Sequence, residues 1–139
     1  MRTTKIAALL MTVSMALVAG QVVTLRPGKY EITAEMESQA GKMRPHKGTQ
    51  CFTAEQLKDP SKVFRDPEME KECKVSDFKV AGNKVTFRTD CRQGDFQATG
   101  TTEVTLGTDS YVALVSTKDN GGRTMTIRQT AKWIGECAK

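Results

Sequence analysis

Residues 73–91 read CKVSDFKVAGNKVTFRTDC, and this stretch decides the fold. Apolar and polar residues alternate on both sides of Gly82-Asn83, a composition typical of a two-residue hairpin turn. A turn of this length pairs Val80 with Val85 across the two strands, and apolar cross-strand pairs of this kind stabilise a sheet. The stretch therefore predicts an antiparallel β-hairpin.

The first arm of this hairpin needs one extra residue. In a regular register Cys73 and Cys91 point to opposite faces, and Val75 is out of phase with the apolar residues that follow it. A β-bulge at Ser76-Asp77 corrects both, because it sets Cys73 opposite Cys91 and Val75 opposite Thr89. We therefore predict a bulge at this point.

The chain contains four cysteines. An even number of cysteines in a small exported domain predicts two disulfides. The bulged hairpin favours Cys73–Cys91 with Cys51–Cys137, and the main alternative is Cys51–Cys73 with Cys91–Cys137. No two cysteines have the C-x-x-C spacing of a zinc or redox site.

The residues before this hairpin predict two more strands and a helix. Residues 29–37 alternate apolar and polar, which is typical of a strand with one face in water. After a turn at residues 40–41, residues 43–51 are polar and contain a proline, so they suit a sheet edge. Thr53 and Gln56 fit a capping box for a short helix that ends before Pro60. We expect an exposed loop over residues 59–72, with a helical turn near residues 61–64.

The residues that follow the hairpin of residues 73–91 predict a meander of antiparallel strands. Residues 96–106 turn at 107–109 into residues 111–118, and Asn120-Gly121 is a second turn, after which the last strand runs to residue 134. The inward side chains of the first of these strands are expected to be those of Phe96, Ala98, Gly100, Val104 and Leu106. A two-residue turn at the second site pairs Leu114 with Ile127 and Ser116 with Met125. With about seven strands and one short helix, the chain is mainly β, a single antiparallel meander forming a partly open barrel or a sandwich.

The N-terminus predicts export. Residues 1–20 have a basic lead, an uncharged apolar run from Ile6 to Ala19 and the small residues Ala19-Gly20, which is the layout of a secretory signal peptide. The run is shorter than the roughly 20 residues of a membrane-spanning helix, although an uncleaved anchor is the alternative. Cleavage leaves residues 21–139 as a single β-rich domain, periplasmic or secreted, with no further transmembrane span.

Composition narrows the function. The net charge of +5 falls by two on removal of Arg2 and Lys5, and basic residues are mixed with acidic ones, so we expect no nucleic-acid partner. The single histidine, His46, would have to serve any histidine-dependent triad, and no nucleophile-elbow or phosphate-loop motif is present. We identify no catalytic residue and expect no cofactor. The expected partner of this monomer is an envelope protein or a small ligand.

Two residue sets are candidate sites. The first is aromatic and lines an interior or a groove, with plain core packing as the alternative: Tyr30, Phe78, Phe87, Phe96 and Trp133. The second is a thioether and imidazole set that Cu(I) accepts, with core packing and surface placement as the alternative: Met36, Met43, His46 and Met125. These sets favour a non-catalytic binding or interaction module. A carrier of a small hydrophobic ligand in a barrel cavity and a weak copper-binding protein are the other hypotheses.

Several of these segments also resemble a known family. Residues 27–33 (PGKYEIT), 51–55 (CFTAE), the central hairpin ending at Cys91, 107–111 (GTDSY) and 134–137 (IGEC) are similar to an exported bacterial family, domain of unknown function 3617. The resemblance covers nearly all of residues 21–139. It implies a periplasmic β-rich domain with no assigned activity and no catalytic residues to transfer. The first hairpin departs from the family, which is richer there in methionine and proline.

Overall fold

The computed structural model describes residues 24–65 and 67–138, so the predicted signal peptide over residues 1–20 lies outside the described residues. Within them the chain forms eight strands, two short α-helices and one 3-10 turn. In chain order the elements are β1 (Gly28–Ser38), β2 (Gly41–Lys42), β3 (His46–Phe52), α1 (Ala54–Leu57), α2 (Pro60–Val63), η1 (Met69–Lys71), β4 (Cys73–Ala81), β5 (Lys84–Gln93), β6 (Phe96–Leu106), β7 (Ser110–Asp119) and β8 (Thr124–Gly135).

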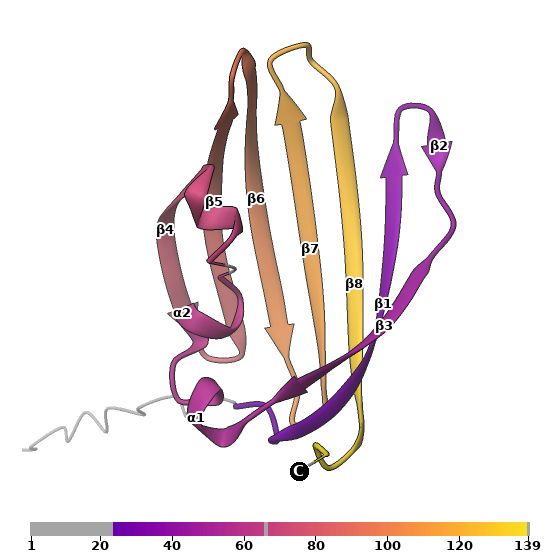
Figure 1. The fold of residues 1–139 in the computed structure, drawn as a ribbon, viewed down its shortest axis with the longest axis vertical. Helices are drawn as coiled ribbons and strands as arrows, with labels where there is room; N and C mark the ends of the chain where they lie inside the picture. Colours follow the sequence, from indigo (N-terminus) through magenta and orange to yellow (C-terminus); the bar gives the residue numbers. More distant parts are fainter. Residues whose placement is uncertain (1–23, 66, 139) are drawn as a thin grey trace, which may run out of the picture.

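All strands belong to one antiparallel sheet, in the order β2-β1-β8-β7-β6-β5-β4, with β3 also paired to β1 (Figure 1). The predicted mainly β meander is confirmed, as a sheet that does not close into a barrel. It has one strand more than expected because β2 lies at residues 41–42, where the turn was expected, while the polar edge strand expected over residues 43–51 begins only at His46, as β3. The second helix, α2, corresponds to the helical turn expected near residues 61–64.

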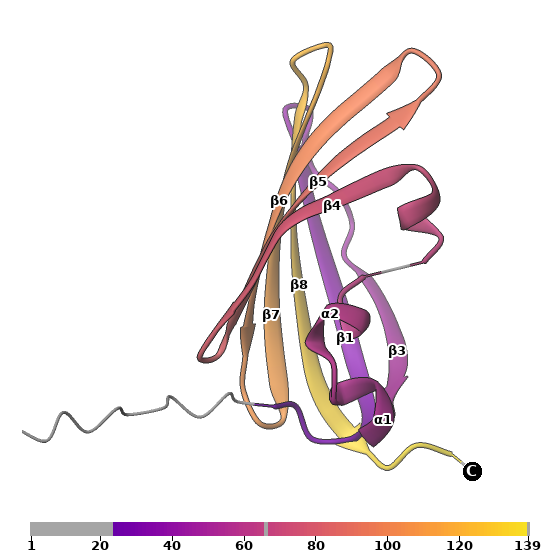
Figure 2. The same ribbon diagram turned by 90° about the vertical axis from the view of Figure 1, so that its left-hand side faces the viewer.

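The sheet is strongly twisted, as sheets of L-amino acids are. Viewed from the side, β4, β5 and β6 are steeply inclined to β7 and β8, and α1 and α2 lie on one side of the sheet (Figure 2). The core lies on that side. Its fully buried side chains are Tyr30, Val85 and Val104, and the helical segment contributes Leu57. The helical segment therefore covers the core on this side of the sheet.

The predicted β-bulge is confirmed in the hairpin of β4 and β5. Cys73 faces Cys91 and Val75 faces Thr89, and the register shifts between Ser76 and Lys79. Asp77, inside the shift, has a φ of 54°, the left-handed conformation that accommodates an extra residue. The structure has a Cys73–Cys91 disulfide, the pairing that the bulge favoured, and its second disulfide joins Cys51 to Cys137.

The predicted register of β7 and β8 is wrong by one residue. Val115, not Leu114, faces Ile127, and Thr117, not Ser116, faces Met125. The cause is a three-residue loop, residues 120–122, where a two-residue turn was expected. Because one more residue in the loop exchanges the two faces of a strand, Leu114 lies on the face opposite the core and is 45% exposed.

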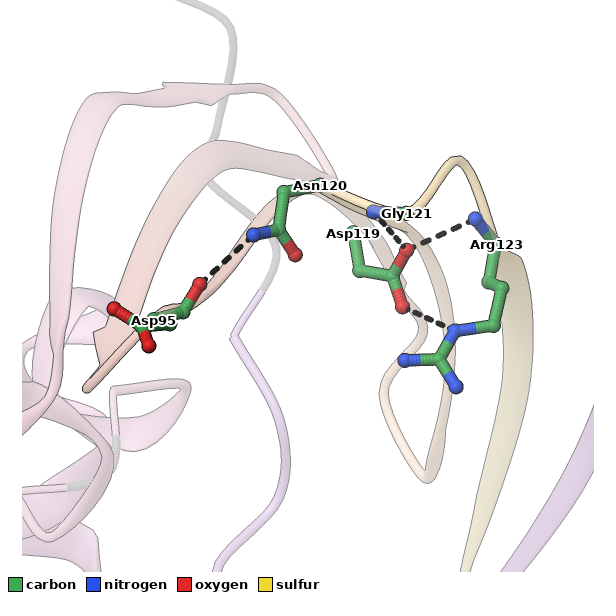
Figure 3. A network of polar contacts seen from close by, with 5 residues as sticks. All are labelled: Asp95, Asp119, Asn120, Gly121 and Arg123. Atoms are coloured by element: carbon green, nitrogen blue, oxygen red, sulfur yellow. Dashed lines mark hydrogen bonds and ion pairs between the residues drawn. The ribbon is translucent and has the colours of Figure 1, made fainter.

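Side-chain hydrogen bonds explain the longer loop. The Asp119 carboxylate accepts hydrogen bonds from the backbone N–H groups of Gly121 and Arg123, at 2.9 Å each, and from Arg123 Nε at 2.7 Å (Figure 3). Gly122 then takes a φ of 78°. Asn120 Nδ2 also donates to the Asp95 carbonyl oxygen at 2.8 Å, which ties this loop to the β5–β6 loop.

The segment between β3 and β4 begins as predicted. Thr53 Oγ1 accepts from Gln56 N and Gln56 Oε1 accepts from Thr53 N, so both halves of the capping box are present. A second cap at Asp59, which accepts from Ser61 N at 3.0 Å, starts α2 at Pro60. The expected loop therefore contains α2 as well as η1.

Candidate functional site

A cleft of about 750 Å³ lies between the core face of the sheet and the segment that holds α1, α2 and η1. The sheet side of the cleft, here called the floor, is formed by Phe87, Val104, Tyr111, Ala113 and Val115, together with threonine and glutamine side chains. The helical side includes Val63 and Phe64. Both sides therefore contribute apolar side chains to an open cleft.

Burial decreases along the floor. Val104, Tyr111 and Ala113 belong to the buried core, whereas Val115 and Thr117 further along are only half-buried. No strand residue that lines the cleft is charged, and the charged lining residues, Lys62 and Arg65, come from the helical side. Arg65 forms an ion pair with Glu70. The cleft thus has an uncharged floor and cationic groups on the opposite side.

Tyr111 lies where the buried core meets the cleft. Its ring makes edge contacts with Phe64 at 5.6 Å and Phe52 at 6.3 Å between ring centroids. Burial raises the pKa of Tyr111 to about 12, and the nearby Tyr30 adds to the rise. Tyr111 is therefore a neutral, well-packed side chain at neutral pH.

The aromatic set expected from the sequence is only partly at the cleft. Phe87 lines it, and Phe78 stacks on Phe87 with ring centroids 5.8 Å apart. Phe96, at the start of β6, is 44% exposed and does not line the cleft, because the sheet is uncovered at that end. Of the β6 side chains expected to point inward, those near the end of the strand, Val104 and Leu106, are buried.

Tyr30 and Trp133 hold the start of β1. The Tyr30 hydroxyl donates to the Arg26 carbonyl oxygen at 2.7 Å, and Trp133 Nε1 donates to the Pro27 carbonyl oxygen at 3.2 Å. The Arg26 guanidinium lies 3.7 Å from the centre of the Trp133 ring. Both aromatic residues are thus explained by packing around Pro27-Gly28, without a ligand.

The lining residues that sequence reasoning missed include Phe52, Val63, Phe64 and Tyr111. Tyr111 was recoverable, because it alternates with Ala113 and Val115 along β7, but the one-residue register error directed attention to Leu114. Val63 and Phe64 carried no such signal. Their position depends on where α2 docks, which periodicity does not encode.

A second depression, of about 1030 Å³, is lined mainly by residues of the opposite face of the twisted sheet, and also by Phe87 and Val115 of the cleft floor. Its lining is largely charged or hydroxyl-bearing and includes Glu35, Glu37, Lys79, Arg88 and Arg128. Its exposed large apolar residues include Leu114 and Met43. This face has no covering element in the described residues.

The thioether and imidazole set lies outside the cleft, near the β1–β2 turn. Met36 and Met125 are half-buried on β1 and β8, Met43 follows β2, and His46 begins β3. His46 is exposed, and its side chain makes no hydrogen bond within residues 24–65 and 67–138. In that part of the chain no three His, Cys, Asp or Glu side chains are grouped as metal ligands.

Comparison with known proteins identifies a family without a known activity. The family model described as "Protein of unknown function (DUF3617)" matches residues 25–137, which include all eight strands and both disulfides. No curated protein and no solved structure matches the chain. By this match, the chain belongs to the DUF3617 family of proteins of unknown function.

Proposed function

We propose that this domain is a non-catalytic binding module that holds a small amphiphile, with the apolar part of the ligand on the cleft floor. The observation that carries the proposal is the cleft itself, about 750 Å³ in volume with an uncharged sheet side. Cavities of a few hundred to about 1,000 Å³ with apolar walls and few polar groups are typical of small-molecule sites.

Lys62 and Arg65 suggest the polar end of the ligand. They are the charged side chains that line the cleft, and both are cationic. An acidic head group near them and an apolar chain along Val115 and Phe87 would match each part of the cleft to a ligand of the same character. A fatty acid is the simplest compound of this class.

We further propose that the protein works outside the reducing cytoplasm, in the periplasm or after secretion. Two disulfides support this, because disulfides persist in oxidising compartments. No helix in the described part of the chain is long and apolar enough to cross a membrane. Intact mass and N-terminal sequencing of the protein recovered from the periplasm test the proposed removal of residues 1–20.

The binding test uses cis-parinaric acid, a fluorescent fatty acid, and two neighbouring substitutions on β7. Val115→Asp places a carboxylate on the cleft floor, whereas Leu114→Asp places one on the opposite face of the same strand. We expect Val115→Asp to weaken binding by at least about tenfold, because an unpaired charge against an apolar ligand costs more than about 1.4 kcal/mol. Leu114→Asp is expected to bind as the wild type does.

Thr117→Asp provides a second floor variant at a more polar position, for use if Val115→Asp does not fold. Circular dichroism establishes folding for each variant. Absence of parinarate binding by the wild type, or an equal loss in the Leu114 and floor variants, would contradict the proposal. Native mass spectrometry of the purified protein then identifies any ligand that the cleft has retained.

A further inference from the structure

Three of the four methionines in the described residues lie together near the β1–β2 turn. Met43 N donates to the Met36 carbonyl oxygen at 2.9 Å, so the ladder between β1 and β2 extends one step further and sets these two residues side by side. On its other side β1 pairs with β8, where Met36 faces Ile127 and Ser38 faces Met125. Met125 is therefore a diagonal neighbour of Met36.

These residues share one face of the sheet. Paired residues in an antiparallel ladder point to the same face, and so do alternate residues along a strand. Met36 is six residues after the buried Tyr30 and so belongs to the core face, at the end of β1 that the helices leave uncovered. The pairings place Met43 and Met125 on the same face.

An irregularity in the edge strand brings His46 to this face as well. His46 pairs with Ala34, whereas Met43 lies beside Met36. Two residues separate Met43 from His46, but only one separates Ala34 from Met36, so the edge strand carries one extra residue. Without it, Met43 and His46 would point to opposite faces.

We propose that Met36, Met43 and His46 form a binding site for Cu(I). Thioether and imidazole groups are the soft, uncharged ligands that this ion accepts. Met43 lies directly beside Met36, and His46 lies diagonally from it. Directly paired residues in a sheet have Cβ atoms about 4.5–5.5 Å apart and diagonal ones about 7–8 Å apart, distances that methionine and histidine side chains can bridge around one ion. Met125 is not a ligand of this site, because it pairs with Ser38 on the other side of β1, four residues along from Ala34, the partner of His46.

The surroundings favour a soft monovalent ion over a hard one. The nearest carboxylates along β1, Glu35 and Glu37, alternate with Met36 and so belong to the opposite face. Hard cations such as Mg²⁺ need several oxygen ligands, which the core face does not offer at this corner. The site is also open to an incoming ion, because Met43 is 48% exposed and His46 is exposed.

The test is a competition for Cu(I) in the absence of oxygen, with the bicinchoninate complex of Cu(I) as the metal source. Ascorbate serves as the reductant, so that no thiol is present to exchange with the disulfides. The wild type is expected to withdraw one Cu(I) per chain. Met36→Leu removes the central ligand with little change in volume, and Met69→Leu in η1 is the matched control.

We expect Met36→Leu to weaken Cu(I) binding by at least about tenfold, the loss typical of disturbing a metal site, and Met69→Leu to bind as the wild type. His46→Ala, at an exposed position, should weaken binding without affecting the fold. All variants keep the same N-terminal residues, so any binding by Met11 or Met15 is constant. Failure of the wild type to compete, or equal binding by the Met36 and Met69 variants, would overturn the proposal.

The methyl groups of methionine give a second readout. With isotope-labelled methionine and Ag(I) as a redox-inert substitute, the methyl resonances of Met36 and Met43 should shift at one equivalent, whereas that of Met69 should not. Shifts that include Met69 or exclude Met36 would reject a defined site. Neither measurement depends on the cleft, so this proposal and the proposed function can fail separately.

Discussion

Replacement of Gly28 by alanine tests how the start of β1 is built. Gly28 has a φ of 146°, and an added Cβ would lie 2.1 Å from Trp133 Nε1 and 2.6 Å from the Gly135 carbonyl oxygen. Atoms cannot approach so closely, so the Trp133 ring must move. The movement would break its hydrogen bond to the Pro27 carbonyl oxygen and its stacking against Arg26.

The expected loss of stability has two parts. Backbone strain for a non-glycine residue at such a φ costs about 1–3 kcal/mol. The lost hydrogen bond adds about 1 kcal/mol and the lost cation–π contact about 0.5–1 kcal/mol. Gly41→Ala isolates the first part, because Gly41 has a φ of 115° but nothing within 4 Å of an added Cβ. We therefore expect Gly28→Ala to cost about 2 kcal/mol more than Gly41→Ala.

The assay is urea denaturation with the disulfides intact, followed by far-ultraviolet circular dichroism. Fluorescence gives a local readout, because Trp133 is the only tryptophan in the chain. Its emission should shift to longer wavelength in Gly28→Ala and stay unchanged in Gly41→Ala. Adding Gly28→Ala to Trp133→Leu should cost less than adding it to the wild type. Equal stabilities of the two glycine variants, with unshifted fluorescence, would refute this reasoning.

Two further predictions concern pH and the disulfides. Tyr111 keeps its proton up to a pKa of about 12, whereas an unfolded tyrosine ionises near 10, so stability should fall as pH rises from about 10 to 12. Tyr111→Phe should reduce this fall in urea denaturation at alkaline pH, and an unchanged slope would contradict the assignment. The Cys51–Cys137 disulfide spans 86 residues and Cys73–Cys91 spans 18, so replacing the first pair by serine should cost about 5 kcal/mol and the second about 3 kcal/mol. A larger loss for the second pair in the same measurement would show that chain entropy is not the dominant effect.

The strand register was predicted correctly where two independent features of the sequence required it, and wrongly where only one did. At Ser76-Asp77 the phase of Val75 and the position of Cys73 both required an extra residue, and the bulge was found. In the β7–β8 loop, the pattern Asn120-Gly121 suggested a two-residue turn, and no cysteine or large aromatic pair constrained the register. The Asp119 hydrogen bonds that lengthen the loop are visible only in three dimensions.

The candidate cleft was harder to predict than the sheet. Alternation indicates which side chains of a strand share a face, so the floor residues were within reach of the sequence. The opposite side consists of one-turn helices, and their docking is set by the contacts of Val63 and Phe64 with the core. Those contacts join residues far apart in the sequence, for which a single sequence provides no pattern.

The two sheet edges also bear on where a partner can bind. β4 carries the bulge with Asp77 in the left-handed conformation, and Pro45, which has no backbone N–H, interrupts the edge between β2 and β3. Lys74 and Lys47 add charge to β4 and β3. Bulges, proline and lysine are the features that prevent edge strands from pairing with another chain. Since both edges carry such features, recognition is expected to use the faces of the sheet, and the core face is the one with an uncharged cleft floor opposite a helical segment.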